Sequence, residues 1–134
     1  MTFQRILIAV DGSPIADRAA ERGFELARSL GATVALVHVV DPEPLPEGGA
    51  AQAEHDGKQL LAEIGRRSLL DPATFVVLGK PATEIVSTAR QWQADLVVIG
   101  SHGRARIERL LIGSVAEAVI RHAPCAVLVM RAAS

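Results

Sequence analysis

The amino-acid sequence predicts a doubly wound α/β fold, in which helices cover both faces of a five-stranded parallel sheet. Short apolar runs rich in β-branched residues alternate along the chain with longer segments whose apolar residues recur at helical spacing. The runs are continuously apolar, a pattern typical of strands that are buried on both faces. Right-handed crossovers place such strands in one parallel sheet with helices on both sides.

A chain of 134 residues suffices for one domain of ordinary size, and we expect residues 1–134 to form a single domain. Hydrophobic residues make up 49% of the chain and charged residues 22%, which excludes a disordered chain. The formal net charge of −1 gives no reason to expect DNA, RNA or an anionic membrane as a partner. Cys125 is the single cysteine, so an internal disulfide and a cysteine-rich zinc site are excluded, and the reducing cytoplasm is the expected compartment.

Turn and cap residues set the boundaries of the expected elements. Ser13 can cap the first helix, Pro14 suits its first position, and Gly31 suits its end. Residues 41–51 are rich in proline and glycine and are expected to form a loop. We expect strands at residues 6–10, 33–40, 74–78, 96–99 and 126–130, and helices at residues 14–30, 53–67, 83–91 and 115–121.

The residues that follow the strands are the candidates for a ligand site. In doubly wound sheets, ligands bind at the carboxyl ends of the strands, where the direction of winding reverses. This rule directs attention to Asp11, to the stretch after Val39, to Gly79 and above all to the residues from Gly100 onward. The dinucleotide motif Gly-x-Gly-x-x-Gly is absent from the sequence, and Pro81 stands where a P-loop needs serine or threonine.

One stretch has the features of a phosphate-binding loop. Gly100-Ser101-His102-Gly103 is followed by nine residues and then by Gly113-Ser114, so two glycines follow a strand and the last pair begins a helix. Glycine permits positive φ, close approach of the backbone and N–H groups that point at an anion. Ser114 then presents its hydroxyl at a helix N-terminus, where the helix dipole also favours negative charge.

A structural explanation of the same residues stays open. Ser114 and Glu117 also form a capping-box pattern, in which each side chain would satisfy the backbone N–H of the other residue. Ser114 could cap the helix in the empty protein and contact phosphate in the loaded one. No Ser/His/Asp set is visible and no catalytic residue is assigned, and His38, within an apolar strand, is expected to be a core histidine with its hydrogen bonds satisfied.

With these motifs the chain resembles the universal stress protein family, in its nucleotide-binding branch. The family pattern G-2x-G-9x-G-[S/T] is met in full by Gly100, Gly103, Gly113 and Ser114. The resemblance covers nearly the whole chain and is carried by residues 6–13, 38–41, 79–82, 95–103, 111–116 and 124–129.

The resemblance implies a Rossmann-like sheet of the adenine nucleotide alpha hydrolase type, with the strand order 3-2-1-4-5. It also implies an ATP-binding regulatory protein of the stress response. ATP would be bound with Mg²⁺ or Mn²⁺, and hydrolysis would be weak at most. Two alternatives stay open: a slow ATPase or nucleotidyl-transfer enzyme, and a dimeric family member that binds no nucleotide. The downstream protein partner is not indicated by the sequence.

The resemblance also implies roles for individual residues. Asp11 corresponds to the acidic residue near the ribose and phosphates, where a divalent metal often binds, and the backbone of Val39 corresponds to the contact with adenine. Family members commonly pair through their last strands, and the apolar edge strand Ala126–Met130 predicts a homodimer on its own account. The residues expected to bind ATP are Ala9, Asp11, Val39, Gly100, His102, Gly103, Gly113, Ser114, Val115 and Ala116.

Overall fold

Strands and helices alternate through the part of the chain that the computed structural model describes, residues 3–102 and 112–131. The strands are β1 (Arg5–Ala9), β2 (Thr33–Val40), β3 (Ala73–Leu78), β4 (Leu96–Gly100) and β5 (Ala126–Met130), and the helices are α1 (Pro14–Leu30), α2 (Gly49–Ser68), α3 (Pro81–Trp92) and α4 (Ser114–His122). All strand pairs are parallel, and the sheet has the order β3-β2-β1-β4-β5. The predicted fold class and strand order are confirmed.

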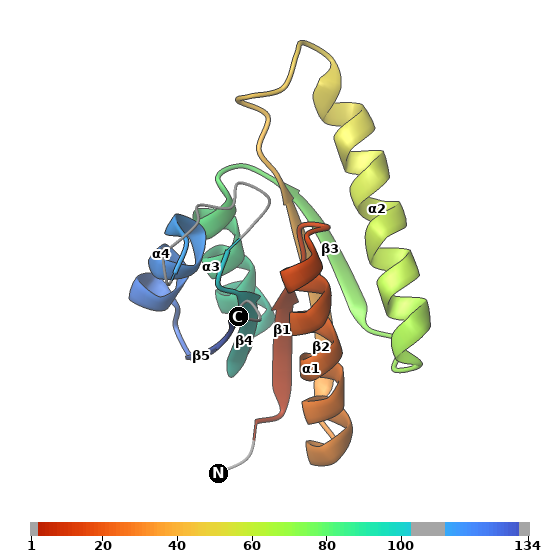
Figure 1. Ribbon diagram of the computed structural model, residues 1–134, viewed down its shortest axis with the longest axis vertical. Helices are drawn as coiled ribbons and strands as arrows, with labels where there is room; N and C mark the ends of the chain where they lie inside the picture. The colour runs from red at the N-terminus through yellow and green to blue at the C-terminus, as the bar shows by residue number, and fades with distance from the viewer. Residues whose placement is uncertain (1–2, 103–111, 132–134) are drawn as a thin grey trace.

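The sheet lies between two layers of helices. Helices α1 and α2 cover one face and helices α3 and α4 cover the other (Figure 1). Successive side chains of a strand point to opposite faces, so Ile8 packs in the core with Phe24 and Leu61, whereas its neighbour Leu7 packs in the core with Ile85. The apolar run of β1 therefore contributes to both cores.

Burial on both faces, expected for every strand, is found only for the inner ones. The side chains of β4 are all buried, whereas β3 and β5 at the two edges are partly exposed. Leu78 at the end of β3 is 46% exposed and Leu128 in β5 is 40% exposed. An edge strand has one neighbour instead of two, and its helices cover it less completely, so an apolar sequence alone does not bury it.

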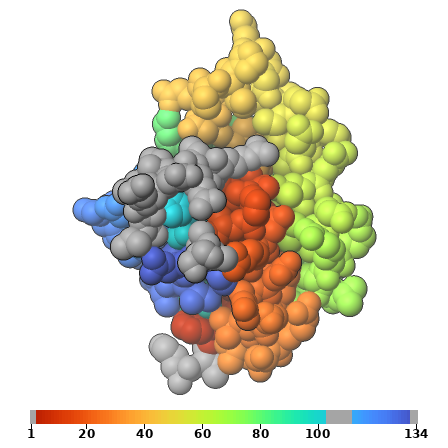
Figure 2. Space-filling view, viewed as in Figure 1, coloured from red at the N-terminus to blue at the C-terminus, as the bar shows by residue number. Residues whose placement is uncertain are grey.

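Three of the four described helices begin earlier than the sequence pattern predicts, and α1 begins at Pro14 as predicted. Helix α2 begins at Gly49 instead of residue 53, α3 at Pro81 instead of residue 83, and α4 at Ser114 instead of residue 115. The first N–H groups of a helix have no partner within it, so proline and glycine are tolerated there. The loop before α2 is correspondingly shorter, and Figure 2 shows it together with the start of α2, in yellow, standing beyond the rest of this face.

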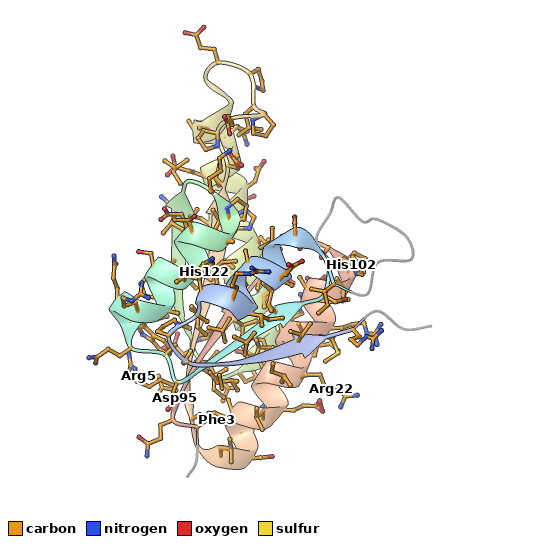
Figure 3. The ribbon with its side chains drawn as sticks, turned by 90° about the vertical axis from the view of Figure 1, so that its left-hand side faces the viewer. Phe3, Arg5, Arg22, Asp95, His102 and His122 are labelled. Carbon is orange, nitrogen blue, oxygen red and sulfur yellow. The ribbon has the colours of Figure 1, made fainter. Side chains whose placement is uncertain are left out.

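Charged side chains fasten the amino ends of β1 and β4 together. The Asp95 carboxylate accepts hydrogen bonds from the backbone N–H groups of Gln4, at 2.8 Å, and Arg5, at 3.0 Å. The Arg5 guanidinium donates two bonds to the carbonyl of Trp92, at 2.8 and 3.0 Å, and lies 4.1 Å from the centre of the Trp92 ring. Figure 3 shows Arg5 and Asp95 at one end of the sheet and His102 at the other.

The described helices include none long and apolar enough to cross a membrane.

The predicted caps of α1 are confirmed. The hydroxyl of Ser13 accepts a hydrogen bond from the N–H of Ala16 at 3.3 Å, Pro14 is the first helical residue, and Gly31 ends the helix in the left-handed conformation.

Two helix ends with the same backbone conformation permit a matched stability test. Gly31 ends α1 at φ 66° and Leu69 ends α2 at φ 60°, a region where a side chain costs about 1–2 kcal/mol. Leu69 is 88% exposed, so its side chain contributes little packing. Leu69→Gly is expected to raise the free energy of unfolding by about 1 kcal/mol and Gly31→Ala to lower it by about as much, both measured by urea denaturation. Destabilisation by Leu69→Gly would contradict this account of the helix end.

Candidate functional site

A cavity of about 260 Å³ opens at the carboxyl ends of the inner strands. Every predicted ATP-binding residue within the described ranges lines it: Ala9, Asp11, Val39, Gly100, His102, Gly113, Ser114, Val115 and Ala116. Gly103, the remaining predicted residue, lies outside the described residues. The structure adds lining residues that the sequence did not single out, namely Val10, Ala16, Val37, Pro81, Ile85, Ile99 and Ser101.

The cavity lies where the direction of winding reverses. Strands β1 and β4 are neighbours, but the chain leaves β1 for α1 on one face of the sheet, whereas α4 lies on the other face (Figure 1). The carboxyl ends of β1 and β4 are therefore not closed over by a common connection, and the space between them stays open to a ligand. The structure thus has a cavity at the predicted place, and ligand binding there stays a prediction.

Asp11 is held in place by the start of α1. Its Oδ1 atom accepts hydrogen bonds from the N–H of Ser13 at 2.9 Å and from the hydroxyl of Ser13 at 2.6 Å. Within the described residues, the structure gives Oδ2 no protein partner, so this oxygen is available to a ligand or a metal ion. The positive end of the α1 dipole stabilises the charge of the carboxylate at this position.

A divalent metal at this site would depend on the nucleotide. Across residues 3–102 and 112–131, no cluster of three or more histidine, cysteine, aspartate or glutamate side chains could hold a metal ion. Mg²⁺ commonly binds through one carboxylate together with substrate phosphates and water. The single available oxygen of Asp11 fits such a role, and phosphate oxygens would complete the coordination.

Ser101 joins the two ends of the glycine loop to β5, a role that the sequence analysis missed. Its carbonyl accepts a hydrogen bond from the N–H of Gly113 at 2.5 Å, and its own N–H donates to the carbonyl of Met130 at 2.7 Å. Its hydroxyl lies 3.1 Å from Nδ1 of His102, and the residue is 1% exposed. The sequence signal that could have indicated this role is a small polar residue directly after a buried strand.

Close approach, and not positive φ, favours glycine at positions 100 and 113. The glycines with positive φ among the described residues are Gly12, Gly31, Gly48 and Gly79, which excludes Gly100 and Gly113. A Cβ at Gly113 would lie 3.0 Å from the carbonyl oxygen of Ser101, and a Cβ at Gly100 would lie 3.1 Å from Cγ2 of Ile15. The expectation that the Gly113 N–H points at an anion is wrong here, because that N–H bonds Ser101.

The capping box expected at the start of α4 is not formed. Gly113 is the N-cap, Ser114 is already the first helical residue, and the cap position makes no side-chain hydrogen bond. A capping box needs serine one position earlier, at the N-cap itself. The exposed hydroxyl of Ser114 and the N–H groups of the first helical turn therefore meet at the cavity, where the helix dipole favours an anion.

In the part of the chain that the structure describes, few side chains that could act as an acid or a base line the cavity. Asp11 and His102 are the titratable side chains among its described lining residues, and Nε2 of His102 is buried with no partner among the described residues. Cys125 lies at the opposite end of the sheet, before β5. Burial raises the pKa of its thiol, and the charge of Asp95 raises it further.

Comparisons with known proteins agree with this fold. The family model of the universal stress protein family matches residues 2–131. Universal stress protein MJ0531 of Methanocaldococcus jannaschii is 34% identical over 140 residues, which cover 96% of this chain and 82% of that protein. The solved structure of hypothetical protein MJ0577 is similar with a TM-score of 0.87 and 25% identity, over 100% of this chain and 99% of the other.

Two similar solved structures hold an adenine nucleotide. A universal stress protein in complex with cAMP is 26% identical, with a TM-score of 0.71, over 98% of this chain and 98% of the other. The universal stress protein from Archaeoglobus fulgidus in complex with dAMP is 25% identical, with a TM-score of 0.72, over 97% of this chain and 99% of the other. Nucleotide binding thus occurs among proteins of similar fold.

The geometry of the loop predicts a large effect on stability at one position and a small effect at its neighbour. Gly113→Ala is expected to lower the free energy of unfolding of the nucleotide-free protein by about 1–2 kcal/mol, because the Cβ presses on the Ser101 carbonyl. Ser114→Ala is expected to change it by less than about 0.5 kcal/mol, because the hydroxyl makes no cap bond. Urea denaturation measures both. A loss of 1 kcal/mol or more in Ser114→Ala would show that the serine is a cap after all.

Proposed function

This chain belongs to the universal stress protein family, and we propose that it serves there as an ATP-binding regulatory module of the stress response. ATP binding changes the shape of the protein or the partner that it holds, and ATP hydrolysis is at most weak. In this proposal the presence or absence of bound nucleotide is the regulatory signal, and the chain acts as a binding module and not as a dedicated enzyme.

The observation that carries this proposal is an apolar slot and an anion-binding helix end in one cavity. Val37, Ile85 and Ile99 contribute apolar walls that suit a purine ring, and the first turn of α4 suits phosphate. The structures that hold cAMP and dAMP add support, because these ligands share an adenine base and a phosphate with ATP. We therefore favour an adenine nucleotide as the ligand class.

The proposed roles follow the cavity from the base to the phosphates. Ala9 and the backbone of Val39 meet adenine, and Gly100, His102 and Gly103 lie under the ribose and the phosphates. The start of α4 binds phosphate through Ser114, Val115 and Ala116, of which Ala116 offers only its backbone N–H. Gly113 lies beside the phosphate, since its own N–H bonds the Ser101 carbonyl. Asp11 binds Mg²⁺ or Mn²⁺ through its available oxygen, together with the phosphates.

Weak hydrolysis follows from the polar groups of the cavity. Phosphoryl transfer depends on positioning and electrostatics, and a base must align the attacking water. Oδ1 of Asp11 is already engaged by Ser13, and Nδ1 of His102 by the hydroxyl of Ser101. Of the remaining atoms, Oδ2 of Asp11 would be occupied by the metal, and Nε2 of His102 is buried without a partner among the described residues. We therefore expect the proposed site to bind phosphate without a base positioned to align water.

Nucleotide binding is tested first by thermal stability. ATP at a hundred times its dissociation constant is expected to stabilise the wild type by about 2.7 kcal/mol, which raises the melting temperature by several degrees. Ser114→Ala is expected to lose about 1–2 kcal/mol of binding free energy in calorimetric titration, because one hydrogen bond to a charged group is removed. The same variant leaves the nucleotide-free stability unchanged, so the loss reports on the ligand.

Asp11→Asn and an exposed position provide the controls. Asp11→Asn is expected to weaken ATP binding mainly when Mg²⁺ or Mn²⁺ is present, since it removes the charge that the metal needs. Leu69→Gly lies far along the chain at the end of α2 and is expected to leave the affinity unchanged. If millimolar ATP leaves the melting temperature of the wild type unchanged, the family member that binds no nucleotide becomes the better description.

We also propose a homodimer through β5. In the described sheet β5 pairs with β4 alone, so its other edge is available to a second copy. The Met130 carbonyl faces β4, where it accepts from Ser101, so the N–H groups of Val127 and Val129 point to the open edge. Leu128 is 40% exposed and adds apolar surface beside that edge.

Val129→Pro and Leu128→Glu are expected to convert the dimer to a monomer in analytical ultracentrifugation at micromolar concentration. The proline removes an N–H that faces the open edge and leaves the ladder to β4 intact, and the glutamates would face each other across a two-fold axis. Leu78→Glu is the matched control, because Leu78 is similarly exposed on the opposite edge strand. A monomeric wild type, or equal dissociation by Leu78→Glu, would reject pairing through β5.

A further inference from the structure

His38 is held against the end of β1 by helix α2. Its Nδ1 atom lies 2.8 Å from the carbonyl oxygen of Val10. A carbonyl oxygen only accepts hydrogen bonds, so Nδ1 carries a proton and donates it. Helix α2 passes the ring at Gly57, where a Cβ would lie 2.6 Å from Cδ2 of His38. Only glycine lets the helix approach this closely, and the ring is confined as a result.

This contact replaces the next rung of the sheet. The N–H of Val10 donates to the carbonyl of Val37 at 2.9 Å. In a regular parallel ladder, the Val10 carbonyl would then accept from the N–H of Val39, two residues further along β2. The described residues contain no such bond; pairing of β1 with β2 ends at Ala9 and Val37, and the carbonyl takes the imidazole instead.

The backbone of Val39 is left facing the cavity. Peptide groups along a strand alternate in direction, and the Val37 carbonyl faces β1, so the N–H and C=O of Val39 face the same side. The Val40 carbonyl faces β3, where it accepts from the N–H of Gly79 at 2.9 Å. Val39 lines the cavity together with Val10, just beyond the last rung.

An N–H and a C=O of one residue form the pattern that an adenine edge can match. The N1 atom of adenine accepts a hydrogen bond and its N6 amino group donates one, whereas guanine presents a donor at N1 and an acceptor at O6. If Val10 consumed the N–H of Val39, the donor of this pair would be lost. The histidine contact therefore decides whether the strand end can distinguish the two purines.

We propose that His38 is a positioning residue for base recognition: by donating to the Val10 carbonyl it keeps the Val39 N–H open to the adenine edge. The inference rests on the proposed nucleotide function and adds the group that makes the site selective for adenine. His38 acts on the ligand only through the backbone of Val10 and Val39, since the imidazole lies on the α2 side of the sheet beside Gly57.

Base selectivity tests the proposal directly. His38→Asn places an amide donor near the position of Nδ1, whereas His38→Gln carries its amide one carbon further and His38→Leu has no donor. Isothermal titration with ATP and GTP is expected to show at least a tenfold loss of ATP affinity in His38→Leu and His38→Gln, with GTP affinity changed less than about twofold. His38→Asn is expected to stay within about threefold of the wild type for both. Equal losses for ATP and GTP, or losses that follow thermal stability across the three variants, would overturn the proposal.

Hydrogen exchange of the nucleotide-free protein tests the same contact without any ligand. In the wild type and in His38→Asn the amide of Val39 is expected to exchange rapidly, as measured by NMR. In His38→Leu and His38→Gln the rung to Val10 can close, and exchange at Val39 is expected to slow at least tenfold, while the amide of Val10 serves as the internal reference. Unchanged exchange at Val39 would overturn the positioning role. If the wild type binds neither nucleotide, the proposed function fails, and the exchange data alone decide the role of His38.

Discussion

Parallel pairing of β1 with β4 at the centre of the sheet is the constraint on which the rest of the structure depends. Ile6, Leu7 and Ile8 pair with the residues that begin β4, and all three are buried completely. Because both strands lie inside the sheet, each needs helices on both faces, and the chain must wind in two directions from this pair. The cavity is the consequence of that reversal, since the carboxyl ends of the two strands lead to different faces.

The polar groups at the two ends of this central pair have different partners. At the amino end, charged groups close the structure: Asp95 holds the backbone before β1, and Arg5 holds the end of α3 through Trp92. At the carboxyl end, peptide groups near Val39 and at the start of α4 are presented to the cavity instead of to neighbouring strands. A closed amino end fixes the relative position of the strands, so the open end can hold its groups in a defined arrangement.

Main-chain groups supply most of the polar chemistry of the cavity, and a few side chains fix their direction. Ser13 orients Asp11, and Ser101 ties Gly113 and His102 to β5. Through the Ser101 bond to Met130, the glycine loop and the edge strand proposed for dimerisation share one hydrogen-bond network. A nucleotide bound at the loop, as proposed, would therefore be connected to that edge through hydrogen bonds.

The sequence by itself determined the fold class, the α1 caps and the place of the cavity, because apolar runs and turn residues are local patterns, and the family resemblance added the strand order. It did not determine how those residues are used. The sequence left open whether Ser114 caps the helix, and in the structure Ser114 is the first helical residue and makes no cap. The N–H of Gly113 was expected to point at phosphate, and it bonds the carbonyl of Ser101. The Ser101 network and the contact of His38 with Val10 join residues that only packing of the strands and α2 brings together. The hydrogen-bond partner of a buried polar group can lie far away in the chain. Only the tertiary structure brings the two groups together and so decides the pairing.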